Sequence, residues 1–226
     1  HLSILGKEIV TERVFKKRLG YYIKEQRTVL LEEVHWFQAF AIECYHGGRG
    51  EQFWFGPSYE ADWVDYDLSS AYPTAKSLIG YPRWREVYTS YNVDDYQPTT
   101  LGVACVDFEF PPEIRYPTLP VRTENGIIFP KTGRSYCAAP EIALAQKLGC
   151  KMNVRFGIIV PTNADDPVFF PFIKTALDER AKSPKGTLES NFWKEIANSL
   201  YGKTAQGLYK KRVFDMRDRD MRELPE

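Results

Sequence analysis

The sequence predicts an α+β fold in which an antiparallel sheet with packed helices is followed by a helical hairpin. Hydrophobic residues make up 43% of the 226 residues and aromatic residues 15%, which is enough to fill a sizeable core. Residues 101–110 and 151–160 have the apolar patterns of strands. The period then changes, because residues 168–182 and 188–201 are amphipathic at helical spacing. The chain therefore passes from a sheet to two helices within one continuous domain.

The N-terminal part of the chain has mixed patterns. Residues 28–40 are apolar enough for a helix or a buried strand, and residues 47–50, Gly-Gly-Arg-Gly, indicate a turn. Residues 53–55, Phe-Trp-Phe, indicate a strand. Residues 62–68 alternate between apolar side chains and the carboxylates Asp65 and Asp67. We expect a strand at residues 62–68 that runs into a turn and a short helix.

The middle of the chain predicts further strands and one helix. In the strand at 101–110, Asp107 and Glu109 point outward, because the alternate residues form one apolar face; these are Ala104, Val106, Phe108 and Phe110. Residues 127–129 indicate a short strand. Residues 139–148 fit a helix with Pro140 in its first turn and Gly149 at its end. A turn at residues 183–186 separates the two C-terminal helices.

Composition excludes several classes of protein. The 30 Lys and Arg residues balance the 30 Asp and Glu residues, which excludes a disordered or supercharged chain. No apolar run approaches the roughly 20 residues that cross a bilayer, so we expect no membrane partner. We see no signal peptide and expect an intracellular, cytoplasmic-type protein. The chain begins with His1 rather than Met, which indicates a fragment, a processed chain or a cloning remnant.

The four cysteines indicate neither redox chemistry nor a structural zinc site. Cys44, Cys105, Cys137 and Cys150 include no C-x-x-C pair. We therefore expect four reduced, partly buried thiols rather than disulfides or metal ligands.

Two stretches of the chain depart from the zero average charge. Seven basic and three acidic residues lie between Lys7 and Arg27, and eight basic and two acidic residues lie between Arg180 and Arg212. Such a run is more often a solvated surface. It indicates a phosphate-binding surface where other chemistry also points to phosphates.

A polar stripe on the last helix points to phosphates. Lys194, Asn198 and Tyr201 are spaced at i, i+4 and i+7, which places a cation, an amide and a phenol on one helical face. Arg180 and Lys182 lie near the preceding turn, so an antiparallel hairpin could bring them close to Lys194. Converging cations repel one another unless a polyanion binds there. A triphosphate is the natural candidate.

Carboxylates at the end of the expected strand at residues 62–68 suit a hard cation. Asp65 and Asp67 stand just before the turn Ser69-Ser70-Ala71-Tyr72-Pro73. Mg²⁺ takes one or two protein carboxylates and completes its coordination with phosphate oxygens and water. This sparse acidic group therefore fits metal-assisted phosphoryl transfer, although an acidic strand end by itself is an ordinary surface feature.

Three motifs carry a resemblance to the family B DNA polymerases. Residues 67–73, DLSSAYP, resemble motif A of that family, D-x-x-S-L-Y-P, with Ala71 in place of Leu. Residues 194–202, KEIANSLYG, match motif B, K-x-x-x-N-S-x-Y-G, at every specified position. Residues 45–48 contain Y-x-G-G, the linker signature of protein-primed and related self-replicating-element polymerases, and precede motif A as the family order requires. The resemblance covers about residues 45–208 and implies a phage or mobile-element enzyme.

The resemblance implies a role for each matching residue in motifs A and B. Asp67 is the metal-bridging carboxylate, with the backbone carbonyl of Leu68 as a further ligand and Asp65 as the alternative. Tyr72 is the steric gate against ribonucleotides. Lys194 binds the triphosphate, with Lys182 or Arg180 as a second cation. The full nucleotide-binding set is Leu68, Ser70, Tyr72, Lys182, Lys194 and Asn198, and the catalytic set is Asp67, Lys194 and Tyr72.

The resemblance also implies partners and a division of the chain. Asn198 and Tyr201 face the nascent base pair; the DNA-contacting residues are Tyr45, Gly47, Gly48, Arg49, Tyr201 and Gly202. The partners are DNA template and primer, dNTP, and a terminal protein as an alternative primer. The cofactor is Mg²⁺, two ions in the complete enzyme, or Mn²⁺ in its place. The segments are an N-terminal segment with the Y-x-G-G linker (1–50), palm with an insertion between motifs A and B (51–165), fingers hairpin (166–205) and a truncated return to the palm (206–226).

One expected motif is absent from the sequence. Motif C, Y-x-D-T-D, supplies the second metal-binding aspartate, and no D-T-D occurs; residues 215–220 have the charges but lack the aromatic strand. We therefore expect the chain alone to be inactive in polymerisation. Two alternatives stay open: a nucleic-acid-binding module that has lost catalysis, and another metal-dependent phosphoryl-transfer enzyme such as a nuclease.

Overall fold

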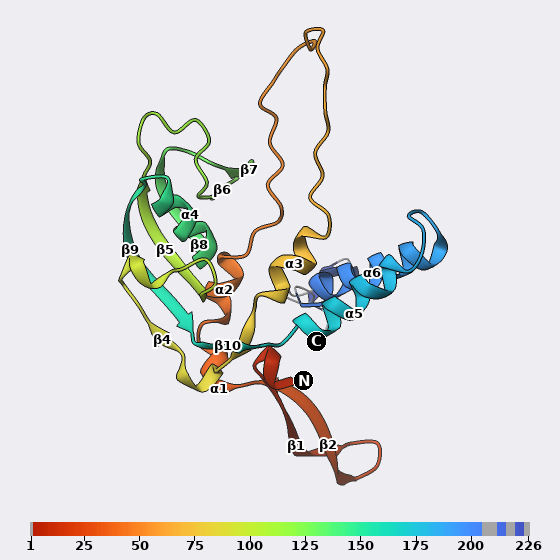
Figure 1. Ribbon diagram of the computed structural model, residues 1–226. Coiled ribbons are helices and arrows are strands. Elements are labelled where there is room, and N and C mark those ends of the chain that lie inside the picture. The colour runs from red at the N-terminus through yellow and green to blue at the C-terminus, as the bar shows by residue number, and fades with distance from the viewer. Residues whose placement is uncertain (1, 205–211, 216–219, 224–226) are drawn as a thin grey trace. The chain divides into compact units, whose positions relative to one another are not determined.

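The computed structural model describes residues 2–204, 212–215 and 220–223 and confirms the α+β prediction (Figure 1). The chain forms two compact units. The first comprises His1–Leu68 and Leu78–Val168, and the second comprises Ser69–Ser77 and Phe169–Glu226. None of the described helices is long and apolar enough to cross a bilayer.

A four-stranded antiparallel sheet forms the centre of the first unit. Its strand order is β4-β9-β5-β8. The bounds are β4 (Tyr88–Thr89), β9 (Lys151–Val160), β5 (Leu101–Glu109) and β8 (Thr132–Ala138). The strands predicted at 101–110 and 151–160 are thereby confirmed, and β5 pairs with both β8 and β9.

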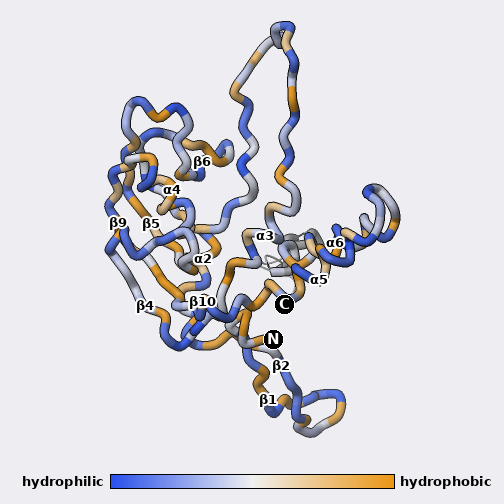
Figure 2. The backbone as a smooth tube through the Cα atoms, in the orientation of Figure 1, coloured by the Kyte–Doolittle hydropathy of each residue, from blue (hydrophilic) through white to orange (hydrophobic). Residues whose placement is uncertain are grey.

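Helices cover both faces of this sheet. Neighbouring residues of a strand point to opposite faces, so Ile158 and Ile159 of β9 enter two different hydrophobic clusters. Ile159 belongs to the cluster that contains Ile142 of α4 (Ala139–Lys147). Ile158 belongs to the cluster of Val34 and Phe37, near α1 (Glu32–His35) and α2 (Gln38–Glu43). Figure 2 shows that β5 is largely hydrophobic along its length.

The predicted helix at residues 139–148 is confirmed as α4. The residues at its two ends explain where the helix begins and where it stops. The carboxylate of Glu141 accepts a hydrogen bond of 2.7 Å from the backbone N–H of Ala138, in the manner of a capping box, and Pro140 occupies the first turn. The helix stops before Gly149, whose φ of +77° is a conformation that favours glycine.

A β-hairpin that the sequence analysis did not predict opens the chain. It consists of β1 (Lys7–Lys16) and β2 (Tyr21–Leu30), and its tip is closed by backbone bonds from Leu19 and Gly20 to the carbonyl of Lys16. Residues 28–40 are therefore neither one helix nor one strand. They end β2 and continue into α1 and α2.

Smaller elements complete the chain. Two-stranded pairs form between β3 (Gly80–Pro82) and β10 (Thr162–Pro167), β6 (Val121–Thr123) and β7 (Gly126–Ile128), and β11 (Arg212–Asp215) and β12 (Asp220–Glu223). Among the described residues, short 3₁₀ helices span Leu2–Leu5, Trp84–Glu86 and Val93–Asp95. The predicted strand at 127–129 corresponds to β7. The predicted segment 206–226 falls largely outside the described residues.

The strands predicted at residues 53–55 and 62–68 and the turn predicted at 47–50 are wrong. The whole segment between α2 and α3 (Ala71–Ser77) has no strand and projects as a long loop (Figure 1). Its residues 51–69 are exposed, so the alternation at 62–68 has no buried face to satisfy. A strand also needs a hydrogen-bonded neighbour, and none pairs with this segment among the described residues.

The second unit contains the predicted helical hairpin. It consists of α5 (Phe170–Ala181) and α6 (Leu188–Thr204), with α3 packed against both. The side chains buried in this unit include Ile173, Ala176 and Ala197. The side chain of Phe192 is 58% exposed and does not take part in this packing. Packing instead follows the stripe that contains Ser190 and Ala197.

The four cysteines are buried and free, as predicted. Burial raises the pKa of Cys44 to about 12 and that of Cys150 to about 11. These thiols therefore behave as core side chains, since the reactive thiolate is disfavoured.

Candidate functional site

The motif A helix and the motif B helix meet within the second unit. Tyr72 of α3 and Tyr201 of α6 stack, with ring centroids 4.7 Å apart and an interplanar angle of 29°. One helical turn along the same face of α3, the ammonium of Lys76 donates a hydrogen bond of 3.0 Å to the carbonyl oxygen of Leu200. It also donates to the hydroxyl of Thr204. The two helices that carry these motifs are thus joined by a stack between motif residues and by hydrogen bonds from Lys76, which follows motif A.

Lys76 is a buried cation whose role the sequence analysis missed. Its side chain is 9% exposed, and its ammonium lies 4.9 Å from the centroid of the Phe169 ring. Burial lowers the pKa of Lys76 to about 8, because the charged form loses hydration. The available signal was spacing: Lys76 follows Tyr72 by four residues on a short helix, so both side chains point the same way.

Arg180 is the cation that lies beside the motif A turn. Its guanidinium donates a hydrogen bond of 3.4 Å to the hydroxyl of Ser70. Ser70 has a φ of 54°, a strained backbone conformation for a residue with a side chain, at the entry to α3. Lys182 is exposed and pairs with Glu179 at 2.5 Å. Of the two cations weighed as second triphosphate ligands, Arg180 therefore has the contact with motif A.

The polar stripe of α6 is open to solvent along most of its length. Lys194, Asn198 and Gly202 are exposed, whereas Tyr201 is half-buried against Tyr72. Among the described residues, Lys194 takes part in no ion pair. Its ammonium is therefore available to an anion.

The motif A carboxylates lie in the exposed segment that belongs to the first unit. Asp65, Asp67 and Leu68 are exposed, and within the described ranges neither carboxylate takes part in an ion pair. Free carboxylate oxygens fit a hard divalent cation. The described residues contain no group of three or more His, Cys, Asp or Glu placed to hold a metal ion, so the fit is to a partial site.

The Y-x-G-G segment is held by its flanking residues. His46 bonds through Nε2 to the carbonyl oxygen of Tyr136 at 2.6 Å, and Arg122 donates to the carbonyl oxygen of the half-buried Tyr45 at 3.3 Å. Gly47 and Gly48 are exposed. A Cβ added to Gly47 would meet no atom within 4 Å, so the local packing does not require glycine there.

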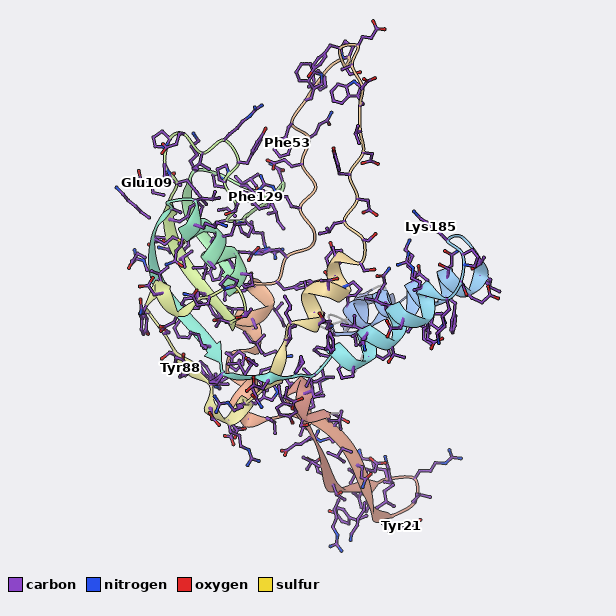
Figure 3. All side chains as sticks on the ribbon, in the orientation of Figure 1. Tyr21, Phe53, Tyr88, Glu109, Phe129 and Lys185 are labelled. Atoms are coloured by element: carbon purple, nitrogen blue, oxygen red, sulfur yellow. The ribbon has the colours of Figure 1, made fainter. Side chains whose placement is uncertain are left out.

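The side chain of Arg49 makes several contacts within the chain. Its guanidinium donates hydrogen bonds to the carboxylate of Glu51 and, at 2.8 Å, to the carbonyl oxygen of Pro117. The guanidinium carbon also lies 3.9 Å from the centroid of the Phe129 ring. Figure 3 shows Phe53 and Phe129 on neighbouring segments. Binding of DNA by Arg49 would require it to exchange these contacts.

Asp107 has a structural role. Arg134 donates to its carboxylate at 2.7 Å, and Arg155 donates to the other oxygen. These hydrogen bonds hold the pKa of Asp107 below its usual value. The side chains of Val106, Phe108 and Phe110 are buried, so the prediction of outward carboxylates on an apolar-faced strand is confirmed.

Comparison with known proteins identifies relatives of this chain. The family model described as DNA polymerase type B, organellar and viral, matches residues 11–225. The primer-independent DNA polymerase PolB of Escherichia coli is 43% identical over 232 residues. The match covers 98% of this chain but 27% of that protein, so the chain spans about a quarter of its relative's length.

Two solved structures show a weaker likeness. The orthorhombic crystal form of Phi29 DNA polymerase has a TM-score of 0.47 and 20% identity, covering 66% of this chain and 28% of that one. Phi29 DNA polymerase complexed with primer-template DNA and incoming nucleotide substrates has a TM-score of 0.45 and 18% identity, covering 70% and 30%.

Proposed function

The chain belongs to the DNA polymerase type B family, organellar and viral, and on that premise we propose that it is the portion of a template-directed DNA polymerase that binds the incoming nucleotide. The observation that supports this most is the junction of motifs A and B. Tyr72, from the motif that begins at Asp67, stacks on Tyr201, from the motif that begins at Lys194. The part of motif A from Ser69 onward and the whole of motif B thereby belong to one unit, whereas Asp67 and Leu68 belong to the first unit.

We assign the nucleotide-binding roles from the contacts of the second unit. The exposed ammonium of Lys194 binds the triphosphate, and Arg180, held beside Ser70, is the second cation. The Tyr72 ring closes the sugar pocket and excludes a 2′-hydroxyl. Its stack against Tyr201 fixes the ring plane, since offset aromatic pairs resist rotation of either ring. Asn198 and Tyr201 face the nascent base pair.

From the same family membership we propose that the complete protein depends on a divalent metal ion. Asp67 would hold Mg²⁺ with the backbone carbonyl of Leu68, and Asp65 is the alternative. A bound Mg²⁺ neutralises the charge that develops on the phosphates during nucleotidyl transfer. Complete two-ion chemistry needs a further carboxylate beyond those of motif A. We therefore expect no primer extension by the isolated 226-residue chain.

The remaining assignments concern the template and the start of synthesis. Tyr45, Gly47 and Gly48 contact the template strand, supported by the open space around Gly47. The E. coli relative is named primer-independent. We propose that the complete protein also starts without an oligonucleotide primer, from a terminal protein or from no primer.

Nucleotide binding to the isolated chain tests the core of this proposal. Titration calorimetry with dATP and Mg²⁺ compares the wild type with Lys194→Ala and Asp67→Asn. Loss of the phosphate contact of Lys194, or of the metal ligand Asp67, should weaken binding about tenfold or more. The matched controls are Lys174→Ala, an exposed cation of α5, and Asp62→Asn, an exposed carboxylate before motif A. Equal losses in variant and control would refute the site, and so would wild-type affinity in Lys194→Ala.

A further inference from the structure

The β1–β2 hairpin has two chemically different faces. The register pairs Arg13 with Lys24 and Phe15 with Tyr22, and the strand period places these four side chains on one face. The other residues of that face within Ile9–Phe15 and Tyr22–Thr28 are Ile9, Thr11, Gln26 and Thr28. This face, called here the basic face, therefore contains no carboxylate.

On the opposite face, acidic side chains form ion pairs with basic side chains. Glu12 and Glu25 are register partners on it, and two like charges placed directly opposite destabilise a sheet. Each finds a cation, since Arg27 pairs with Glu12 at 2.6 Å and Lys16 pairs with Glu25 at 2.6 Å. The acidic residues of these strand segments are satisfied within the hairpin.

The basic face has no such compensation. Arg13 and Lys24 are also direct register partners of like charge, and within the described residues neither takes part in an ion pair. The hairpin tip adds Lys17 and Arg18, both exposed. An uncompensated pair of cations favours the binding of an anion with more than one charge, which would bridge them.

Aromatic rings lie next to these cations. Phe15 and Tyr22 contact each other with centroids 5.1 Å apart, and their side chains are 47% and 65% exposed. Tyr21, labelled in Figure 3 at the hairpin tip, pairs with Lys16 and therefore belongs to the opposite face. Exposed rings beside cations suit a ligand that repeats an anion and a flat ring, because phosphates pair with the cations while unpaired bases stack on the rings.

We propose that the basic face of the β1–β2 hairpin is a binding surface for single-stranded nucleic acid, made of other residues than the proposed nucleotide site. The choice of nucleic acid among polyanions rests on the proposed function. The choice of a single strand rests on the rings, since bases within a duplex cannot stack on Phe15 and Tyr22. Thr11, Gln26 and Thr28 add neutral hydrogen-bonding groups along the same face.

Fluorescence anisotropy of a labelled oligothymidylate tests the charge contribution in the full 226-residue chain. The variant Arg13→Ser/Lys24→Ser should bind at least about tenfold more weakly at low salt. The slope of log K against log salt should fall in magnitude by about 1.4, as two phosphate contacts in a single strand are lost. The control Lys16→Ser/Arg27→Ser removes the same charge from the opposite face and should change affinity less than about threefold.

The ring contribution has its own variant. Phe15→Leu/Tyr22→Leu keeps apolar side chains in the hairpin but removes both stacking surfaces, and it should weaken oligothymidylate binding about tenfold. A duplex of the same length should bind this variant and the wild type alike. Equal losses for single strand and duplex would overturn the stacking role. Equal losses in the two charge variants would overturn the assignment to this face.

Two further measurements separate this surface from the nucleotide site and from a lipid-binding surface. Binding of dATP with Mg²⁺ should be unchanged in Arg13→Ser/Lys24→Ser, so the failure of this proposal is distinguishable from failure of the nucleotide site. Vesicles of phosphatidylcholine and phosphatidylserine test an anionic membrane. Vesicle binding that depends on Arg13 and Lys24, with unchanged oligothymidylate affinity, would overturn the proposal in favour of a lipid surface.

Discussion

Replacing Lys76 with Met should remove a rise in the stability of the second unit with pH. The pKa of this ammonium falls from 10.5 to about 8 on burial, so the folded state binds the proton more weakly than the unfolded state. Between these values the unfolded chain carries more protons, and the free energy of unfolding therefore increases as pH rises. This increase in the free energy of unfolding is present in full above pH 10.5 and is lost as the pH falls through 8.

The size of the effect follows from the two pKa values. The whole shift corresponds to at most about 3 kcal/mol. Between about pH 7.5 and 9.5, linkage gives an increase of at most about 2 kcal/mol, roughly a twentyfold change in the unfolding constant. In Lys76→Met the increase should be absent, because Met has no proton to exchange.

Fluorine NMR of the chain labelled with 5-fluorotryptophan, recorded in increasing urea, measures the free energy of unfolding of each unit. Trp193 lies in α6, whereas Trp84 lies in the first unit and donates to the carbonyl oxygen of Ser3. The Trp193 resonance reports the unfolding of the second unit. The quantity to compare is the difference in unfolding free energy between wild type and Lys76→Met, which should grow by up to about 2 kcal/mol over the pH range.

The first unit supplies an internal control of opposite sign. Burial raises the pKa of Cys44 to about 12 and that of Cys150 to about 11, so the unfolded thiols lose protons first as pH rises above 9. The stability reported by Trp84 should therefore fall in that range for both proteins. A difference between wild type and Lys76→Met that stays constant from pH 7.5 to 9.5 would refute the burial argument for Lys76.

Two further predictions follow from close contacts. In a polymerase that contains this chain, Tyr72→Val should raise ribonucleotide incorporation about 10- to 100-fold in a primer-extension assay, because the ring no longer fills the space of the 2′-hydroxyl; unchanged sugar selectivity would contradict the gate. Gly157→Ala should destabilise the first unit by about 1–3 kcal/mol in urea, since the new Cβ would lie 1.8 Å from the Tyr96 hydroxyl oxygen. Adding Tyr96→Phe should restore part of this loss.

The sequence predicted those elements in which burial follows a regular period over at least part of the element. β5 alternates because Val106 and Phe108 enter the core while Asp107 pairs with arginines of the neighbouring strands. The α5–α6 hairpin was predictable from its amphipathic period and the Pro184-Lys185-Gly186 turn. In both cases burial imposes a periodicity that local residue types reveal.

The errors arise where burial does not follow the pattern. Residues 62–68 alternate as a strand would, yet they are exposed and have no strand partner in the described part of the chain. The β1–β2 hairpin was missed because its residues form paired strands although their sequence lacks the pattern of a strand. Its basic face mixes charged, polar and aromatic side chains, so that its strands lack a consistent apolar face.

The candidate site was predictable as a set of motifs but not as a set of contacts. Motif spacing indicated Tyr72, Lys194 and Tyr201, and Tyr72 stacks on Tyr201 in the second unit. The contacts of Lys76 with Leu200 and Thr204 join residues 124 and 128 positions apart, which no local pattern encodes. Long-range pairs of this kind depend on how helices pack.

The contacts of α3 suggest why its two inward residues differ in chemistry. Tyr72 meets α6 through a ring that a nucleotide sugar could also contact, whereas Lys76 meets the end of the same helix through hydrogen bonds and is buried. Rotation of α3 would break the bond from Lys76 to Leu200 and separate the rings of Tyr72 and Tyr201 together. The geometry of the proposed sugar gate is therefore coupled to Lys76, a lysine outside the proposed nucleotide-binding set.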